Sequence, residues 1–246
     1  MMSLMDRFRE YFLVELARTP AQKSRVYRIR YRVYCEQFQY EPAEQFPTGE
    51  EFDEFDARSE HCLIVHRRTG RAAACVRVVP ALGDAATDPL PIERVFADRL
   101  DQAYLAELGP DRGRLCEVSR LAVDEAFRRR AGEACSRHGE PVAALCGPHE
   151  RSTFPFICMA GFLGATALTE LTGRTNVFAM MEPFLARMLA RSGIVFRRVG
   201  GDLDYHGIRA PYFTTTQSAL EGMEPEMRSM YESIADEIRF DYDRVA

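Results

Sequence analysis

A carboxylate and a guanidinium occur three residues apart in a stretch that otherwise has the pattern of a buried strand. Glu117 and Arg120 lie within residues 116–124, CEVSRLAVD. A charge in such a strand must be paired or used, because an isolated buried charge costs too much free energy. In an extended strand Glu117 and Ser119 share one side and Arg120 faces the other, unless a bulge turns one of them toward a cleft. A proton-transfer site and a structural ion pair are the two interpretations.

Two groups of charged residues precede this strand and are candidates to surround it. Residues 21–38 have apolar positions at helical spacing with four arginines among them, which predicts a helix rich in arginine. Residues 40–58 form an acidic stretch broken by proline and glycine, and a loop of this length is typical of a lid or a binding loop. Residues 61–66 and 73–79 predict two strands joined across Thr69-Gly70.

The other segments alternate between helical and extended patterns. We expect helices at 8–16, 90–108, 154–171, 183–191 and 224–240, strands at 176–181 and 193–199, and an irregular insertion at about 127–152. This alternation predicts an α/β chain, with a mixed sheet and helices on its faces. With no internal repeat and no linker, residues 1–246 are expected to form a single domain.

Composition excludes several classes of protein. The net charge of −5 argues against bulk nucleic-acid binding. No stretch approaches the roughly 18 to 20 apolar residues that a membrane span needs, so we expect no transmembrane segment. The first 20 residues carry charges where a signal peptide would be apolar, which predicts a cytoplasmic protein. The seven cysteines are odd in number and mostly lie in apolar runs, so reduced core thiols are expected.

Four motifs in a fixed order resemble the acyl-homoserine-lactone autoinducer synthases, which are acyltransferases of GNAT-like fold. They are the positions Arg30, Tyr34 and Tyr40, the loop Glu51-Phe52-Asp53-Glu54-Phe55-Asp56, the strand end Arg77-Val78-Val79-Pro80 and the strand Glu117-Val118-Ser119-Arg120. The chain departs from that family in having no tryptophan. Residues 151–213 are more similar to a sister group, the PEP-CTERM/exosortase system-associated acyltransferases, which resemble the N-acyl amino acid synthases.

These resemblances imply an α+β, GNAT-like acyltransferase fold with a central, mostly antiparallel mixed sheet flanked by helices. They imply transfer of an acyl group from the phosphopantetheine thioester of an acyl carrier protein, with no other cofactor. The acceptor amine is S-adenosylmethionine in the autoinducer synthases and a free amino acid in the other branch. A free amino acid is the first hypothesis here. A non-catalytic module that binds a carrier protein or an acyl chain is the alternative from another class, and whether the donor is an acyl carrier protein or coenzyme A stays open.

The chemistry assigns roles to the matching residues. Glu117 is the candidate base that removes a proton from the acceptor amine. Arg30 and Arg77 can bind a substrate carboxylate or fix the acidic loop, with loop fixing preferred for Arg77, and Arg120 is expected to pair with an acid of that loop. The predicted catalytic residues are Glu117 and Arg120, and the predicted substrate-binding residues are Arg30, Tyr34, Tyr40, Asp53, Asp56, Arg77 and Ser119. A structural ion-pair role is the alternative for Glu117 and the three arginines.

Three weaker signals complete the prediction. An acidic carrier protein needs a basic patch, which Arg128, Arg129 and Arg130 could supply, or else Arg187, Arg191, Arg197 and Arg198; a solvated charge run is the alternative. Cys135, His138, Cys146 and His149 have the types and pair spacing of a zinc site, but the short gap between the pairs makes a protein without bound metal the preferred prediction. His206 is expected to anchor its loop rather than act as an acid or base.

Overall fold

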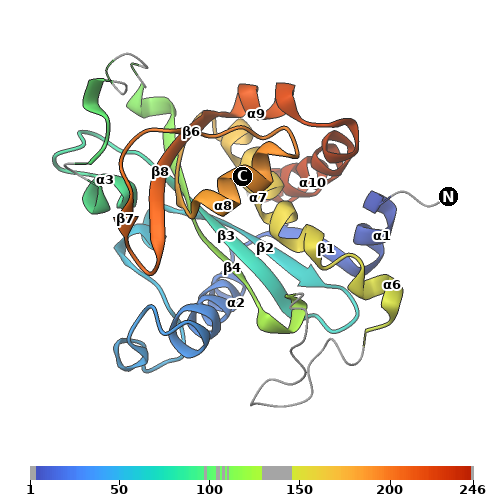
Figure 1. Ribbon diagram of the computed structural model, residues 1–246. Coiled ribbons are helices and arrows are strands. Elements are labelled where there is room, and N and C mark those ends of the chain that lie inside the picture. Colours follow the sequence, from blue (N-terminus) through green and yellow to red (C-terminus); the bar gives the residue numbers. More distant parts are fainter. Residues whose placement is uncertain are drawn as a thin grey trace.

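A mixed sheet of eight strands forms the centre of the computed structural model, which describes residues 4–96, 99–103, 106, 109, 111–128 and 146–244 (Figure 1). The path through the sheet is β1-β2-β3-β4-β5-β8-β6, and β7 pairs with β8. The strands are β1 (Phe12–Leu16), β2 (Glu60–His66), β3 (Ala72–Pro80), β4 (Leu115–Val123), β5 (Asn176–Met181), β6 (Arg197–Arg198), β7 (Leu203–Asp204) and β8 (Ile208–Thr215). All neighbours in this sheet are antiparallel except β4 and β5, which are parallel. The expectation of a mostly antiparallel mixed sheet is confirmed.

Helices cover both faces of the sheet, and strand β2 has apolar side chains on both of its sides. Cys62 and Ile64 pack in the cluster that contains helices α7 (Pro155–Leu171) and α10 (Pro225–Asp243). Leu63 and Val65, which point the other way, pack against helix α2 (Pro20–Arg30). Figure 1 shows α7 and α10 together on one face and α2 on the other. A strand buried on both faces needs such a continuous apolar run.

Strand β4 contains the bulge that its charges required. Cys75 pairs with Ala122 and Arg77 pairs with Ser119, so β4 has one more residue than β3 between these pairs. Arg120 lies in this interval with φ of +52°, in the left-handed region. The extra residue turns Arg120 to the face that also carries Ser119, and it leaves Leu121 facing α7, where its Cδ1 lies beside Gly161.

The parallel strands β4 and β5 stay paired over only part of their length. Their register runs from Leu115 with Asn176 to Val118 with Ala179, although β4 continues to Val123 and β5 to Met181. Beyond Val118, β4 is held by β3 and β5 by β8. The two halves of the sheet therefore diverge next to Glu117 and Ser119.

The N-terminal prediction was partly wrong. Residues 8–16 are not one helix: α1 (Leu4–Tyr11) is followed directly by strand β1, which pairs with β2. The predicted helix at 21–38 is α2 followed by a π-helical segment, Tyr31–Gln37. In α2, Thr19 and Gln22 form a capping box and Pro20 begins the helix.

Two other segments differ from their patterns in the part of the chain that the structure describes. The region 90–108 contains a short helix, α3 (Pro91–Val95), and Leu100 forms a bridge with Gly200. Only Arg197–Arg198 of the predicted strand at 193–199 is extended in the sheet. The other helices are α6 (Pro148–Arg151), α8 (Pro183–Ala190) and α9 (Thr216–Gly222). Among the described helices, none combines the length and apolar character that crossing a membrane requires.

Candidate active site

Arg30 is the centre of a buried charged network between α2 and the acidic loop. Its side chain is fully buried at the end of α2, and its Nε donates to Glu51. Nη1 and Nη2 donate to the two oxygens of Asp56 at 2.6 and 3.0 Å. Such a bidentate pair fixes both position and orientation of the carboxylate. Arg30 therefore fixes the acidic loop, which was one of its two predicted roles.

The acidic loop ends in a tight 3₁₀ turn, Glu54–Arg58, that its own aspartates stabilise. Asp53 is the N-cap and accepts from the backbone N–H of Phe55 at 2.9 Å, while Asp56 accepts from the N–H of Asp53 at 2.7 Å. Arg77, from β3, donates from Nη1 to Asp53 Oδ1 at 2.6 Å and lies 3.2 Å from Asp56 Oδ1. Both predicted loop aspartates are thus brought together by Arg77.

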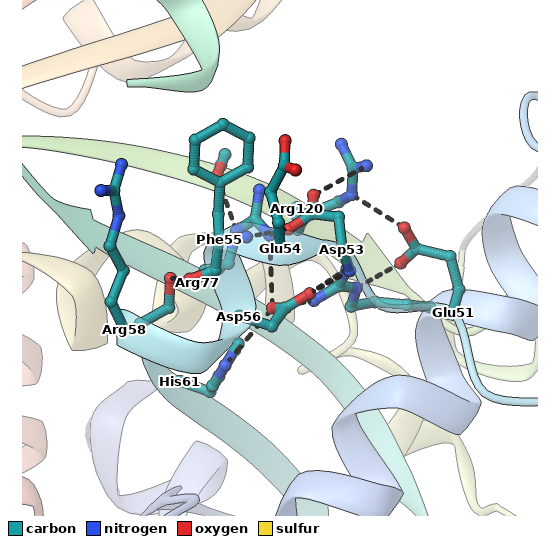
Figure 2. Close-up of polar contacts among 12 residues, drawn as sticks. Glu51, Asp53, Glu54, Phe55, Asp56, Arg58, His61, Arg77 and Arg120 are labelled. Carbon is teal, nitrogen blue, oxygen red and sulfur yellow. Dashed lines mark hydrogen bonds and ion pairs between the residues drawn. The ribbon is translucent and has the colours of Figure 1, made fainter. Parts of the chain in front are cut away.

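Arg120 closes the network from the bulge in β4. Its Nε donates to Glu51 Oε1 at 3.2 Å and its Nη2 to Asp53 Oδ2 at 3.4 Å, and Nη2 lies 3.6 Å from Glu41. Figure 2 shows Arg77 and Arg120 on either side of Asp53, with Asp56 below it. The expectation that Arg120 pairs with an acid of the loop agrees with this geometry. Ser119 accepts a hydrogen bond from Arg77 Nε at 3.2 Å.

The arginines of the network favour the ionised forms of Asp56 and Glu51. Burial raises the pKa of Asp56, but Arg30 and Arg77 outweigh this and hold it below its ordinary value. Burial also raises the pKa of Glu51, but Arg30 and Arg120 outweigh burial and the pKa is lowered. His61, across from Arg77 in the β2–β3 register, has a pKa lowered to about 3 by burial and is neutral, with Nε2 3.5 Å from Asp56.

The pKa of Glu117 is shifted in the direction opposite to those of Asp56 and Glu51. It is buried, and burial raises its pKa to about 7, although the Ile92 N–H, Arg77 and Arg120 act in the opposite direction. Its Oε2 accepts a hydrogen bond of 2.6 Å from the N–H of Ile92, in the first turn of α3. A carboxyl group that is half ionised near pH 7 has the proton affinity of a general base. The same bond also anchors α3, so the structural and the catalytic interpretations coexist.

Aromatic rings border the network where the tip of the β7–β8 hairpin meets residues 34–40. Tyr34 donates from its hydroxyl to the carbonyl of Leu121 at 3.0 Å, and burial raises its pKa to about 12. Tyr40 stacks on His206 with ring centroids 4.6 Å apart and on Phe38 at 5.0 Å. The contact with Tyr40 ties the hairpin tip to the loop, in keeping with the anchoring role expected of His206.

An apolar pocket lies on the opposite face of the sheet at the same divergence. It lies between α7 and strands β4, β5 and β8 and reaches Val118, the last residue of β4 that pairs with β5. Its lining includes Phe162, Ala165, Val177, Ile194 and Phe196. Val118 and Glu117 are adjacent in β4 and so face opposite sides. The pocket and the charged network therefore meet at one point of the sheet.

The predicted basic patch and the candidate zinc set lie only partly within the described residues. Arg128 donates to the Val123 carbonyl at 2.7 Å and to Gln37, so it is engaged within the chain. Cys146 does not pair with the exposed His149; it lies instead beside His66 and Glu150. Arg129, Arg130, Cys135 and His138 lie outside the described residues.

Sequence reasoning missed three members of the site. Glu51 belongs to the quoted acidic motif but received no role, although it joins Arg30 to Arg120. Its spacing of two and five residues from Asp53 and Asp56 was an available signal. Glu41 and His61 gave no signal, because only the loop fold and the strand register place them here.

Known proteins are similar in sequence to the part of the chain that contains the site. Residues 29–136, which contain the network and Glu117, match the model of the acetyltransferase (GNAT) domain. An acyl-homoserine-lactone synthase from Agrobacterium fabrum (strain C58) is 24% identical over 187 residues, which are 76% of this chain and 72% of that protein.

Two solved structures are similar over most of their length. One is TofI in a ternary complex with an inhibitor and MTA, with TM-score 0.59 and 19% identity over 88% of this chain and 99% of that chain. The other is FeeM, an N-acyl amino acid synthase from uncultured soil microbes, with TM-score 0.54 and 13% identity over 86% of this chain and 94% of that chain. The described chain therefore has the GNAT-like fold, with its charged site inside the segment that matches the GNAT acetyltransferase domain.

Proposed function

We propose that this protein is an N-acyltransferase that moves a fatty acyl group from a carrier thioester to the amino group of an amino acid. The observation that carries the proposal is the position of Glu117. It lies where β4 and β5 diverge, between a charged network on one face of the sheet and an apolar pocket on the other. A polar acceptor can approach this point from the network side, and an acyl chain would enter from the other side by widening the pocket, whose volume is about 20 Å³.

Glu117 supplies the proton transfer that amide formation needs. An amino acid is mostly an ammonium ion at pH 7, and a carboxylate with a pKa of about 7 can accept its proton directly or through a water. The neutral amine then attacks the thioester carbonyl, so that a carbon–nitrogen bond forms and the carbon–sulfur bond breaks. A second amine proton ends on the leaving thiol. Backbone N–H groups of β4 beyond Val118, on the edge that β5 has left, are suited to the developing oxyanion.

Arg77 is the residue best suited to hold the acceptor's carboxylate. It is 1% exposed, and its Nη2 is buried without a hydrogen-bond partner among the described residues. A buried donor left unpaired costs free energy that an anionic ligand would recover. A rearrangement of the Asp53 side chain, 27% exposed, would open the way to this nitrogen. The guanidinium groups of Arg30 and Arg120 are bonded to acids of the loop.

The same geometry suits a second acceptor, because S-adenosylmethionine also carries an amine and a carboxylate on one carbon. The similarity to an acyl-homoserine-lactone synthase favours this autoinducer synthase alternative. For the donor, an acyl carrier protein is proposed, with coenzyme A as the competing carrier; a cytoplasmic location would give access to either. An association with a PEP-CTERM/exosortase system stays a prediction from resemblance.

The experiment is mass spectrometry of lipid extracts from cells that express the protein, beside cells that express Glu117→Gln. A new N-acyl amino acid in the first sample alone would support the proposal and identify acceptor and chain length. An acyl-homoserine lactone would favour the second acceptor. Absence of any new lipid, repeated with purified protein and both acyl carriers, would contradict acyl transfer and leave the non-catalytic binding module.

Glu117→Gln is expected to lower turnover by roughly 100-fold or more, because the amide cannot take the amine proton. The amide oxygen can still accept the hydrogen bond from Ile92, so the anchor of α3 is retained. Turnover is measured with saturating substrates, and circular dichroism checks the fold. The matched control is Glu93→Gln, which alters the neighbouring acid that caps Leu90 in the same helix. A rate near that of the wild type for Glu117→Gln would exclude the base role.

A further inference from the structure

A second cluster of reactive side chains lies away from the charged network, where the β2–β3 hairpin meets α6. His66, Cys146 and Glu150 each offer a ligand atom, and these atoms lie within 4.8 Å of one another. All three residues are buried, with exposed fractions of 0, 4 and 5%. None of them has a role in the proposed acyl transfer. His66 is far in the sequence from Cys146 and Glu150, and only the fold brings it to them.

The cluster has the chemistry of a transition-metal site. Imidazole nitrogen, thiolate sulfur and carboxylate oxygen are the three donor types that Zn²⁺ uses in proteins. His66 Nε2 contacts Glu150, while its Nδ1 is 2.8 Å from the hydroxyl of Thr69. A second partner of this kind orients a ligating histidine and fixes its tautomer. The ring is also held between Phe12 and Phe127, each with its centroid 5.4 Å away.

A cation already approaches the same atoms. Nη2 of Arg68 is 3.6 Å from Glu150 and 3.8 Å from the sulfur of Cys146. The Arg68 side chain is 52% exposed, so it can turn outward without uncovering the core. The cluster thus attracts positive charge at a point that opens to solvent through a movable side chain. The simplest alternative is a histidine–glutamate pair that needs no metal.

We propose that His66, Cys146 and Glu150 form a zinc-binding site with one coordination position open to solvent. Binding displaces Arg68 and releases the Cys146 thiol proton to solvent, while His66 ligates through Nε2 as the neutral tautomer whose Nδ1–H donates to the Thr69 hydroxyl. The three protein ligands then hold Zn²⁺ with a water as the fourth ligand. The metal would tie the end of β2 to the segment that leads into α7. This site differs from the four residues considered as a zinc set in the sequence, because it uses Cys146 without His149.

The test measures metal binding by the full-length wild-type protein, which is reduced, stripped by a chelator and then supplied with Zn²⁺ or Co²⁺. We expect one equivalent of Zn²⁺ to be retained after gel filtration. We expect Co²⁺ to give the near-ultraviolet thiolate charge-transfer band and the strong visible bands of a tetrahedral site. Cys146→Ala should abolish the charge-transfer band and Glu150→Gln should weaken binding at least tenfold. Cys158→Ala, which alters another partly buried cysteine in α7, and His149→Gln should leave the band unchanged.

Arg68→Ala distinguishes a metal site from a structural pair. If the guanidinium competes with the metal, its removal should tighten Zn²⁺ binding several-fold, as measured by competition with a chromogenic chelator. Wild-type protein that retains less than a tenth of an equivalent of Zn²⁺ and gives no cobalt band would overturn the proposal, and this result does not depend on the folding of any variant. A band lost in His149→Gln but kept in Cys146→Ala would also overturn it.

Discussion

At the scale of single residues, Glu117 is a buried acid whose environment favours its neutral form. Burial raises its pKa from an ordinary 4.5 to about 7. The folded protein therefore binds a proton more tightly than the unfolded chain, and the associated stability is present below pH 4.5 and is lost as pH rises to 7. The size is on the order of 3 kcal/mol. We expect Glu117→Gln to remove this loss, so that its free energy of unfolding changes less between pH 5 and 7.5.

Urea unfolding of both proteins at several pH values measures this difference. Asp56 and Glu51 titrate with the opposite sign, because their pKa values are lowered and their contributions to stability are lost as pH falls. The effect of these two acids is therefore confined to acid solution, below the window in which Glu117 titrates. If the two pH profiles were parallel from pH 5 to 7.5, the raised pKa of Glu117 would be wrong.

Arg30 shows how strongly a buried ion pair can depend on one partner. Arg30→Ala leaves Glu51 and Asp56 buried without their main cation, and we expect a loss of about 3 to 5 kcal/mol in the free energy of unfolding. The control is Arg25→Ala, which breaks a partly exposed pair with Glu15 at 3.3 Å and a hydrogen bond to the Gly70 carbonyl, and it should cost less than about 1 kcal/mol. Equal losses in the two variants would mean that the network does not stabilise the loop.

At the scale of elements, a close contact between the ends of α8 and α9 depends on glycine. Gly193 has φ of +82°, and a Cβ built on it would lie 1.7 Å from the carbonyl oxygen of Gly222. Gly193→Ala must therefore move backbone as well as adopt an unfavourable φ, and we expect it to cost about 3 kcal/mol. Gly173→Ala has a similar φ of +67° but meets nothing within 4 Å, so about 1 kcal/mol is expected. Thermal unfolding of the two variants separates the cost of the left-handed φ, present in both, from the cost of the close contact with Gly222, present only in Gly193→Ala.

The apolar pocket makes a prediction about helix α7. Ala165 is 1% exposed and lines the pocket beside Val118. Ala165→Leu adds volume there, and we expect preference to shift toward shorter acyl chains, by roughly tenfold in the ratio of kcat/KM values for long and short donors. The control is Ala160→Leu, in the same helix but outside the pocket lining. An unchanged chain-length profile in a folded Ala165→Leu protein would place the acyl chain elsewhere.

At the scale of the whole molecule, local patterns predicted most of the elements and the identity of most charged residues of the site. The strands at residues 61–66, 73–79 and 176–181 and the buried helix α7 follow their patterns closely. The opening segment was misassigned, because the five apolar-rich residues of β1 continue directly from α1 and only pairing with β2 makes them a strand.

What local patterns could not predict are the distances between segments. The left-handed φ of Arg120 has no residue-type signal, since glycine and asparagine are the usual residues there. The bulge was foreseen only as a condition for Glu117 and Arg120 to share a face. The approach of His61 and Glu41 to the network, and of His66 to Cys146, depends on strand register and loop path, which no short motif encodes.

The divergence of β4 and β5 has a consequence for the order in which the chain folds. The strands β1 to β4 are joined by antiparallel pairs, whereas the parallel pair β4–β5 must wait for the long crossover through α7. Arg30, Arg77 and Arg120 all belong to the first half, so we expect their network to assemble before the second half docks. Glu117 would then acquire its partner strand β5 at that later step. The acid–base site would therefore be complete only after β4 and β5 pair. Hydrogen exchange at the amides of Val118 and Phe178 would report the opening of this strand pair.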